Sequence, residues 1–197
     1  MTNLNELIAK RIDGSLAAIA SLRTPPHAQH LAAIIETVRD RLKLGGTIYT
    51  CGNGGSAAEA LHLAEELIGR YRGDRPPHRA MCLNADPTAL TCIANDFGFE
   101  RIFARQCEAL LTDRDALIVF STSGNSPNIV QALQAAKARG AMTIGLLGCS
   151  GGRDGGSAAA ECARSLIVPA QDSAHIQEAH QVALHLICEA LEGPQLA

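Results

Sequence analysis

Apolar residues recur at helical spacing in residues 3–22 and 28–43, and Thr24-Pro25-Pro26 separates the two stretches. Spacing of three and four residues places apolar side chains on one helix face, so the pattern predicts two amphipathic N-terminal helices. The first helix carries an apolar stripe of Leu4, Leu7, Ile8, Ile12, Leu16 and Ile19. This stripe is longer than packing on one small domain requires, so we expect residues 1–44 to serve in oligomerisation. The alternative is that the stripe packs on its own subunit.

From residue 45 onward, short apolar runs alternate with helical stretches. Strands are predicted at Thr47–Cys51, Ala80–Leu83, Ala116–Phe120, Thr143–Leu147 and Leu166–Val168. Helices are predicted at Ala57–Ile68, Pro87–Ala94, Glu100–Leu111, Asn128–Arg139 and Ile176–Leu191. Such alternation is typical of an α/β fold, here a three-layer α/β/α sandwich with a five-stranded parallel sheet behind two N-terminal helices. We expect a single domain over residues 1–197, with 45–197 as its α/β core.

Composition narrows the class of protein. Apolar residues make up 47% of the chain, and no apolar run approaches the roughly 18 residues of a membrane span. A net charge of −3 and 3% aromatic residues, without Trp, provide no broad basic or stacking surface for nucleic acid. The N-terminus lacks a continuous apolar signal segment, and the seven cysteines form no CxxC pair. We therefore expect a cytoplasmic protein without nucleic-acid or membrane partners.

A glycine-rich loop, Cys51-Gly52-Asn53-Gly54-Gly55-Ser56, connects the first predicted strand to a helix. Glycine lets the backbone approach a ligand, and a helix N-terminus offers unpaired N–H donors, so this glycine loop suits an anion or a hydroxyl. The loop has neither the GxGxxG nor the P-loop fingerprint of nucleotide-binding proteins. A strand-to-helix turn of purely structural use is the alternative.

A second loop, Ser121-Thr122-Ser123-Gly124-Asn125-Ser126, also lies between a predicted strand and a helix. Four hydroxyls beside glycine and helix-start N–H groups suit a phosphate without any lysine. The alternative is helix capping, because Ser126 precedes Pro127 where a cap would lie. One hydroxyl suffices for a cap, so the four in this hydroxyl loop favour phosphate binding.

Two predicted helices carry titratable or amide side chains at suggestive spacing. His62 and Glu66 are four residues apart and share a helix face with Glu65 beside them, which suits a metal pair or acid–base chemistry. On the last helix, Gln177, His180 and His185 interrupt an apolar pattern, where any single histidine is most often a surface or satisfied core residue. The eight residues from Gln177 to His185 correspond to about 12 Å of rise, so spacing alone pairs Gln177 with His180.

Five motifs together resemble the phosphoheptose isomerases, a family of SIS (sugar isomerase) domains. They run in family order along nearly the whole chain: Gly52-Asn53-Gly54-Gly55-Ser56, His62-Leu63-Ala64-Glu65-Glu66-Leu67 with Gly69-Arg70, Asn95-Asp96, Ser121-Thr122-Ser123-Gly124-Asn125-Ser126, and Ile176-Gln177-Glu178-Ala179-His180 with His185. The hydroxyl loop is typical of SIS domains in general. Glu66 together with His185 distinguishes the catalytic phosphoheptose isomerases from nonenzymatic relatives.

The resemblance implies a set of site residues and an assembly. Substrate contacts are expected at Asn53, Gly54, Gly55, Ser56, Glu66, Asn95, Asp96, Ser121, Thr122, Ser123, Ser126 and Gln177. One zinc ion per subunit is implied at His62, Glu66, Gln177 and His185, a set of imidazole, carboxylate and amide ligands that zinc accepts. Related isomerases are homotetramers with active sites at subunit interfaces. The chain departs from the family at His175, where members usually have Arg.

The implied activity is conversion of sedoheptulose 7-phosphate to D-glycero-D-manno-heptose 7-phosphate, a heptose for lipopolysaccharide, a capsule or another glycan. Moving a proton between C1 and C2 requires a base, an acid and stabilisation of an enediolate, without a redox cofactor. We expect Glu66 to move the carbon proton and His185 the oxygen proton. The alternatives are isomerisation of another phosphosugar, such as an arabinose or hexulose phosphate, and a nonenzymatic SIS module that binds a replication initiator protein. The joint presence of the four implied zinc ligands argues against the nonenzymatic module.

Overall fold

The computed structural model describes residues 3–150, 152 and 154–192. Two helices, α1 (Leu4–Ser21) and α2 (Pro25–Lys43), precede the sheet. Helix α2 begins three residues earlier than the pattern predicted, because proline is tolerated in the first turn, where a backbone N–H has no helical partner. None of the described helices is both long and apolar enough to cross a membrane.

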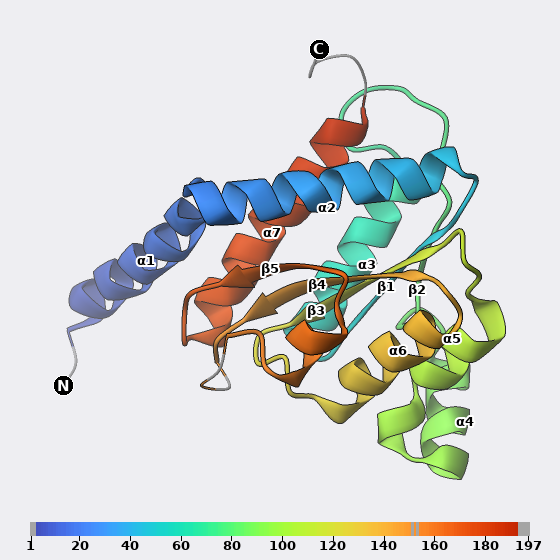
Figure 1. The fold of residues 1–197 in the computed structure, drawn as a ribbon. Coiled ribbons are helices and arrows are strands. Elements are labelled where there is room, and N and C mark those ends of the chain that lie inside the picture. Colours follow the sequence, from blue (N-terminus) through green and yellow to red (C-terminus); the bar gives the residue numbers. More distant parts are fainter. Residues whose placement is uncertain (1–2, 151, 153, 193–197) are drawn as a thin grey trace.

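A parallel sheet of five strands forms the centre of the described chain (Figure 1). The strands are β1 (Ile48–Gly52), β2 (Ala80–Cys82), β3 (Ala116–Ser121), β4 (Met142–Gly148) and β5 (Arg164–Val168). Their order is β2-β1-β3-β4-β5, and Gly52 of β1 lies opposite Phe120 of β3. The glycine loop and the hydroxyl loop therefore leave neighbouring strands at the same edge of the sheet.

Helices cover both faces of this sheet. They are α3 (Gly55–Ile68), α4 (Pro87–Phe97), α5 (Ala104–Leu110), α6 (Pro127–Ala138) and α7 (Ser173–Leu191), with short 3-10 turns η1 (Phe99–Arg101) and η2 (Ser157–Glu161). Ile118 and Phe120 of β3 enter the core formed with α2, α3 and α7, whereas Leu117 and Val119 enter the core formed with α5 and α6. The central strand β3 is buried along its whole length because both of its faces are covered. The predicted three-layer fold is confirmed.

One predicted helix differs in the structure. Residues 100–111 form the turn η1 followed by α5, and Ile102 donates its backbone N–H to the carbonyl of Phe99, three residues back. Ile102 and Phe103 are adjacent and both buried. A continuous α-helix separates adjacent side chains by about 100°, so a break between η1 and α5 lets both enter the core.

Helices α3 and α7 pack side by side on one face of the sheet, and this contact positions the chemistry described below (Figure 1). Alanines line the contact on both helices, with Ala60 and Ala64 on α3 and Ala179 and Ala183 on α7, all buried. Small side chains allow two helices to approach closely. Polar residues beside these alanines are therefore brought within reach of one another.

Candidate functional site at the strand ends and between two helices

Side-chain amides hold the glycine loop at the sheet edge. Asn84, which follows β2, accepts a hydrogen bond from the backbone N–H of Gly52 at 3.1 Å and donates one to the Gly52 carbonyl at 3.0 Å. Asn53 exchanges two hydrogen bonds with Asn128 of α6, at 2.9 and 2.8 Å. Asn128, which follows the hydroxyl loop in the sequence, thus holds the side chain of the predicted substrate residue Asn53.

The hydroxyl loop is held by its own side chains and by the segment after β4. Ser121 Oγ accepts the N–H of Gly124 at 3.0 Å, and Ser123 Oγ accepts the N–H of Asn125 at 3.2 Å. Gly124 has φ +62°, and a Cβ there would lie 1.8 Å from the carbonyl oxygen of Gly155, so only glycine fits. The loop backbone is therefore fixed before any ligand binds.

Ser126 bears on the two interpretations of the hydroxyl loop. It occupies the N-cap position of α6, yet among the described residues its side chain makes no capping hydrogen bond. Thr122 Oγ1, in contrast, lies 3.1 Å from the hydroxyl of Ser173 and 3.3 Å from that of Ser150. A hydroxyl that does not cap its own helix is free for a ligand, which favours the anion-binding interpretation.

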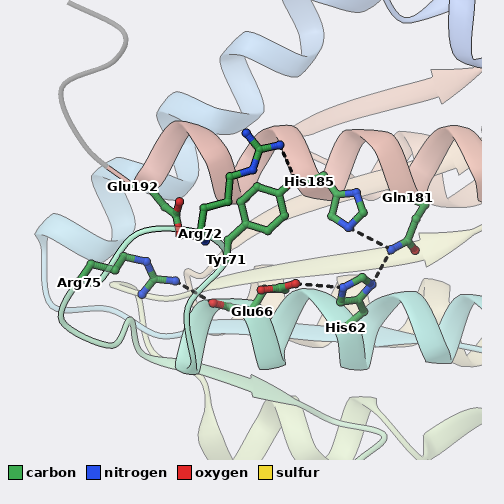
Figure 2. A network of polar contacts seen from close by, with 8 residues as sticks. All are labelled: His62, Glu66, Tyr71, Arg72, Arg75, Gln181, His185 and Glu192. Atoms are coloured by element: carbon green, nitrogen blue, oxygen red, sulfur yellow. Dashed lines mark hydrogen bonds and ion pairs between the residues drawn. The ribbon is translucent and has the colours of Figure 1, made fainter.

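Four side chains meet between α3 and α7, and we call His62, Glu66, Gln181 and His185 the α3–α7 cluster (Figure 2). His62 Nε2 lies 3.2 Å from Glu66 Oε1. The amide nitrogen of Gln181 contacts Nδ1 of His62 and lies 3.4 Å from Nε2 of His185. The two imidazole rings are edge to face, with centroids 5.2 Å apart. A carboxylate and two imidazoles from two helices are therefore side by side.

The segment after α3 closes one end of this cluster. Tyr71 stacks on the His185 ring with centroids 5.4 Å apart, and Arg75 donates hydrogen bonds to the carbonyls of Glu66 and Leu67 at the end of α3 (Figure 2). Burial, together with the charges of His62 and Arg72 and against the opposing effect of Glu66, lowers the pKa of His185. The neutral, proton-accepting imidazole is consequently favoured at neutral pH.

Gln177 lies at the start of α3 rather than inside the α3–α7 cluster. Its amide nitrogen is 3.4 Å from Ser56 Oγ, and a Cβ on Gly55 would lie 2.5 Å from that nitrogen. Within the described chain, Gln177 forms no hydrogen bond with His62, Glu66 or His185. The structure thus joins Gln177 to the predicted substrate residues Gly55 and Ser56, while His62, Glu66 and His185, three of the four implied zinc ligands, meet about two turns further along α3 and α7.

The side chains of the cluster fit a divalent metal in part. One ligand atom each from His62, Glu65 and Glu66 lie within 4.8 Å of one another. Imidazole nitrogen and carboxylate oxygen are ordinary zinc ligands, so the donor chemistry is suitable. Among the described residues, His185 does not complete a group within that distance, so its Nε2, which faces Gln181, would have to turn towards the other two side chains.

The other predicted substrate residues, Asn95 and Asp96, are exposed near the end of α4. Asn95 donates a hydrogen bond to Asp96 at 2.7 Å. A hollow of 270 Å³ separates α4 from the glycine loop, with Asn53 and Gly54 on one wall and Thr91 and Ala94 on the other. Asn95 and Asp96 are therefore adjacent to one wall of this hollow in the sequence, but make no hydrogen bond to the glycine or hydroxyl loop within the described residues.

A buried acid and a buried imidazole lie beneath the site. His180 is fully buried, and its Nε2 lies 3.0 Å from the Leu147 carbonyl, to which it can only donate. Its Nδ1 is 4.0 Å from Glu59 Oε2. Burial raises the pKa of Glu59 to about 8 and lowers that of His180 to about 4. The pair is thus uncharged at neutral pH, and His180, which spacing alone paired with Gln177, belongs to the core.

Sequence reasoning missed three amides: Asn84, Asn128 and Gln181. Gln181 precedes His185 by four residues and so shares its helix face, which is a signal that could have been used. Asn128 follows Pro127 directly and was taken only as the start of a helix. His175, the departure from the family, packs against α1, where a Cβ on Gly14 would lie 2.2 Å from its ring. His175 therefore links the start of α7 to α1.

Comparisons with known proteins identify the family and the fold. Residues 14–148 match the SIS domain family. A phosphoheptose isomerase of Trichlorobacter lovleyi is 43% identical over 96% of this chain and 94% of its own length. The structure of a phosphoheptose isomerase from Francisella tularensis superposes with a TM-score of 0.87 at 31% identity, covering 98% of this chain and 99% of that one. The corresponding enzyme from Neisseria gonorrhoeae gives a TM-score of 0.87 at 36% identity over 95% and 97%.

Proposed function

The chain belongs to the phosphoheptose isomerases of the SIS domain family, and on this premise we propose that it converts sedoheptulose 7-phosphate to D-glycero-D-manno-heptose 7-phosphate. The observation that carries the proposal is the α3–α7 cluster, where Glu66 lies 3.2 Å from His62 and the His185 ring lies beside them. These groups suit an aldose–ketose isomerase because proton transfer needs a carboxylate base and an imidazole, and no electron acceptor.

Glu66 removes a proton from C1 of the ketose and returns it to C2, which leaves an enediolate between the two transfers. His185 carries the accompanying proton between the oxygens on C1 and C2. The lowered pKa of His185 supports this role, because a neutral imidazole can accept a proton and then release it. Each step moves only protons, so atoms and electrons balance within the sugar.

The phosphate end of the sugar is assigned to Ser121, Thr122, Ser123 and Ser126, and the sugar hydroxyls to the glycine loop, Gln177, Asn95 and Asp96. Helix-start N–H groups and hydroxyls bind a phosphate without needing a lysine. Contacts remote from the reacting carbons position C1 and C2 beside Glu66. The fixed backbone of the hydroxyl loop supports this assignment.

We propose one zinc ion per subunit at His62, Glu66 and His185, and the fourth implied ligand, Gln177, which contacts Ser56, would have to turn towards them. When bound, the metal would polarise the carbonyl oxygen as a Lewis acid. Equilibrium dialysis with zinc followed by elemental analysis is expected to find about one metal per chain. His62→Ala and His185→Ala are expected to lower that value, and full occupancy in both variants would contradict the assignment.

We propose a cytoplasmic homotetramer. Leu4, Ile8 and Leu16 of α1 are 69%, 55% and 58% exposed in the single chain, which is unfavourable unless another surface covers them. Seven free cysteines fit a reducing compartment. Replacing Leu4, Ile8 and Leu16 together by Ser is expected to lower the mass in solution by light scattering. An unchanged mass, or a monomeric wild-type chain, would contradict the tetramer.

Turnover in D₂O tests the activity and its mechanism together. Purified protein should convert sedoheptulose 7-phosphate to the heptose, and NMR should find solvent deuterium at C2 of the product because an acid–base mechanism exchanges the proton. Product without deuterium, together with normal turnover in Glu66→Gln, would contradict the role of Glu66. Turnover of only pentose or hexose phosphates, or of none, would contradict the substrate assignment.

A further inference from the structure

Three amides lie beyond the carboxyl ends of the strands: Asn84 after β2, Asn53 after β1, and Asn128 in the first turn of α6. Asn84 binds both backbone groups of Gly52, and the next residue, Asn53, exchanges two hydrogen bonds with Asn128. The three amides therefore join the glycine loop to the first turn of α6, immediately after the hydroxyl loop. Sheet pairing ends before these loops, so the amides are the contacts that continue the register beyond the strands.

The Asn128 side chain is buried in the protein and is not accessible to a ligand. It is 1% exposed, and both its amide oxygen and its amide nitrogen are paired with Asn53 at 2.9 and 2.8 Å. A buried amide that loses its partner carries a desolvation cost, so the pair has one favoured geometry. Asn53 is less buried, and each of its polar atoms retains capacity for one more hydrogen bond.

The two loops joined by this pair have different tasks in the proposed function, on which this inference rests. The hydroxyl loop receives the phosphate. The glycine loop leads directly into α3, which carries Glu66. The separation of the loops therefore sets how far the phosphate lies from the base, and that distance corresponds to the number of carbons between phosphate and C1.

We propose that Asn128 is a specificity-determining residue that acts through Asn53. The pair fixes the spacing between the hydroxyl loop and the start of α3, and so selects a seven-carbon sugar phosphate over shorter ones. Asn128 itself does not touch the substrate. It is a positioning residue, and a wrong spacing penalises the transition state more than binding because the reacting atoms must align.

Asn128→Asp tests the proposal with an almost unchanged shape. The substitution replaces the NH₂ group that donates to Asn53 by a carboxyl oxygen, which cannot donate when the carboxyl is ionised, so one of the two hydrogen bonds is lost in that state. We expect the ratio of kcat/KM for sedoheptulose 7-phosphate over that for fructose 6-phosphate to fall about tenfold, mainly through kcat for the heptose, as for one buried hydrogen bond. Gln134→Leu, which removes an amide of α6 that contacts Glu161, is the matched control and should leave the ratio unchanged.

A second variant covers the case in which Asn128→Asp does not fold. Asn128→Ser replaces the amide by a shorter hydroxyl side chain that cannot make both hydrogen bonds to Asn53, and it should show the same loss of discrimination. A ratio equal to that of the wild type in a folded variant, with only a lower melting temperature, would overturn the proposal and leave the pair a stability element. If the wild type did not turn over the heptose phosphate, the proposed function itself would be contradicted, and the role proposed for Asn128 would fall with it.

Discussion

The hydroxyl loop and the α3–α7 cluster differ in how their polar groups are held. The loop backbone is fixed by short-range hydrogen bonds, such as Ser121 to Gly124, and by the close contact of Gly124 with Gly155. The cluster depends on two helices separated by more than a hundred residues, and its contacts run through Gln181. The hydroxyl loop, which is the binding end of the site, is therefore held by nearby residues. The α3–α7 cluster, which is the reacting end, depends on the packing of two helices.

The largest effect is expected at the reacting end, from Glu66→Gln. The amide conserves shape but cannot act as a base, so kcat for the heptose phosphate should fall by about two or more orders of magnitude. Circular dichroism and light scattering should match the wild type. A Glu66→Gln protein with nearly normal kcat would rule out Glu66 as the base and move the chemistry away from the cluster.

Gln181→Met tests how the two helices hold the reacting groups, because it removes the amide between the two imidazoles while conserving side-chain length. Residues that orient metal-binding histidines typically contribute about 10- to 100-fold to metal affinity, so zinc affinity should fall by about tenfold or more. Competition with a chromophoric chelator measures this without turnover. Gln134→Met on α6 is the control, and equal zinc affinity in wild type and Gln181→Met would show that the amide has no part in the metal site.

Ser126→Ala tests the binding end. Its hydroxyl does not cap α6, so we expect KM for the sugar phosphate to rise by about tenfold with little change in kcat, as for one lost hydrogen bond to a charged group. Ser15→Ala removes a hydroxyl that bonds only within α1 and should change neither parameter. An unchanged KM in Ser126→Ala would show that this hydroxyl does not bind the phosphate.

Glu59→Gln should have the smallest effect on turnover and a measurable one on stability. Between pH 6.5 and 8 the folded chain holds a proton on Glu59, whose pKa is raised to about 8, while the unfolded chain has lost it. The free energy of unfolding therefore falls as pH rises, by up to about 2 kcal/mol more than in Glu59→Gln. His180, with its pKa lowered to about 4, contributes only below pH 6.5. Urea unfolding of the wild type and of Glu59→Gln at pH 6.5 and pH 8 measures this difference. If the free energy of unfolding changed equally with pH in both proteins, Glu59 would be ionised in the folded chain.

Local patterns were enough to predict the layers and both loops. Apolar runs such as Ala116–Phe120 identify buried parallel strands, and glycines and hydroxyls mark the loops where those strands end. The split of residues 100–111 was missed because periodicity does not reveal that adjacent Ile102 and Phe103 are both buried. Gln181 was overlooked although it shares a helix face with His185. The rotation of α7 against α3, which places Gln177 beside Ser56, was beyond the sequence pattern, and Gln177 was assigned to the metal site through the resemblance alone.

The packing of α7 has a consequence for synthesis on the ribosome. This helix follows all other described elements, yet it packs on α1, α2 and α3, which precede or flank the first strand. Until α7 has been synthesised, the parts of α1, α2 and α3 that pack on it have no partner and remain accessible to solvent or to chaperones. Contacts between distant segments form slowly and leave apolar surface exposed in the meantime. The helix that brings His185 to the site thus also completes the core, so a nascent chain cannot hold the finished site before its fold is closed.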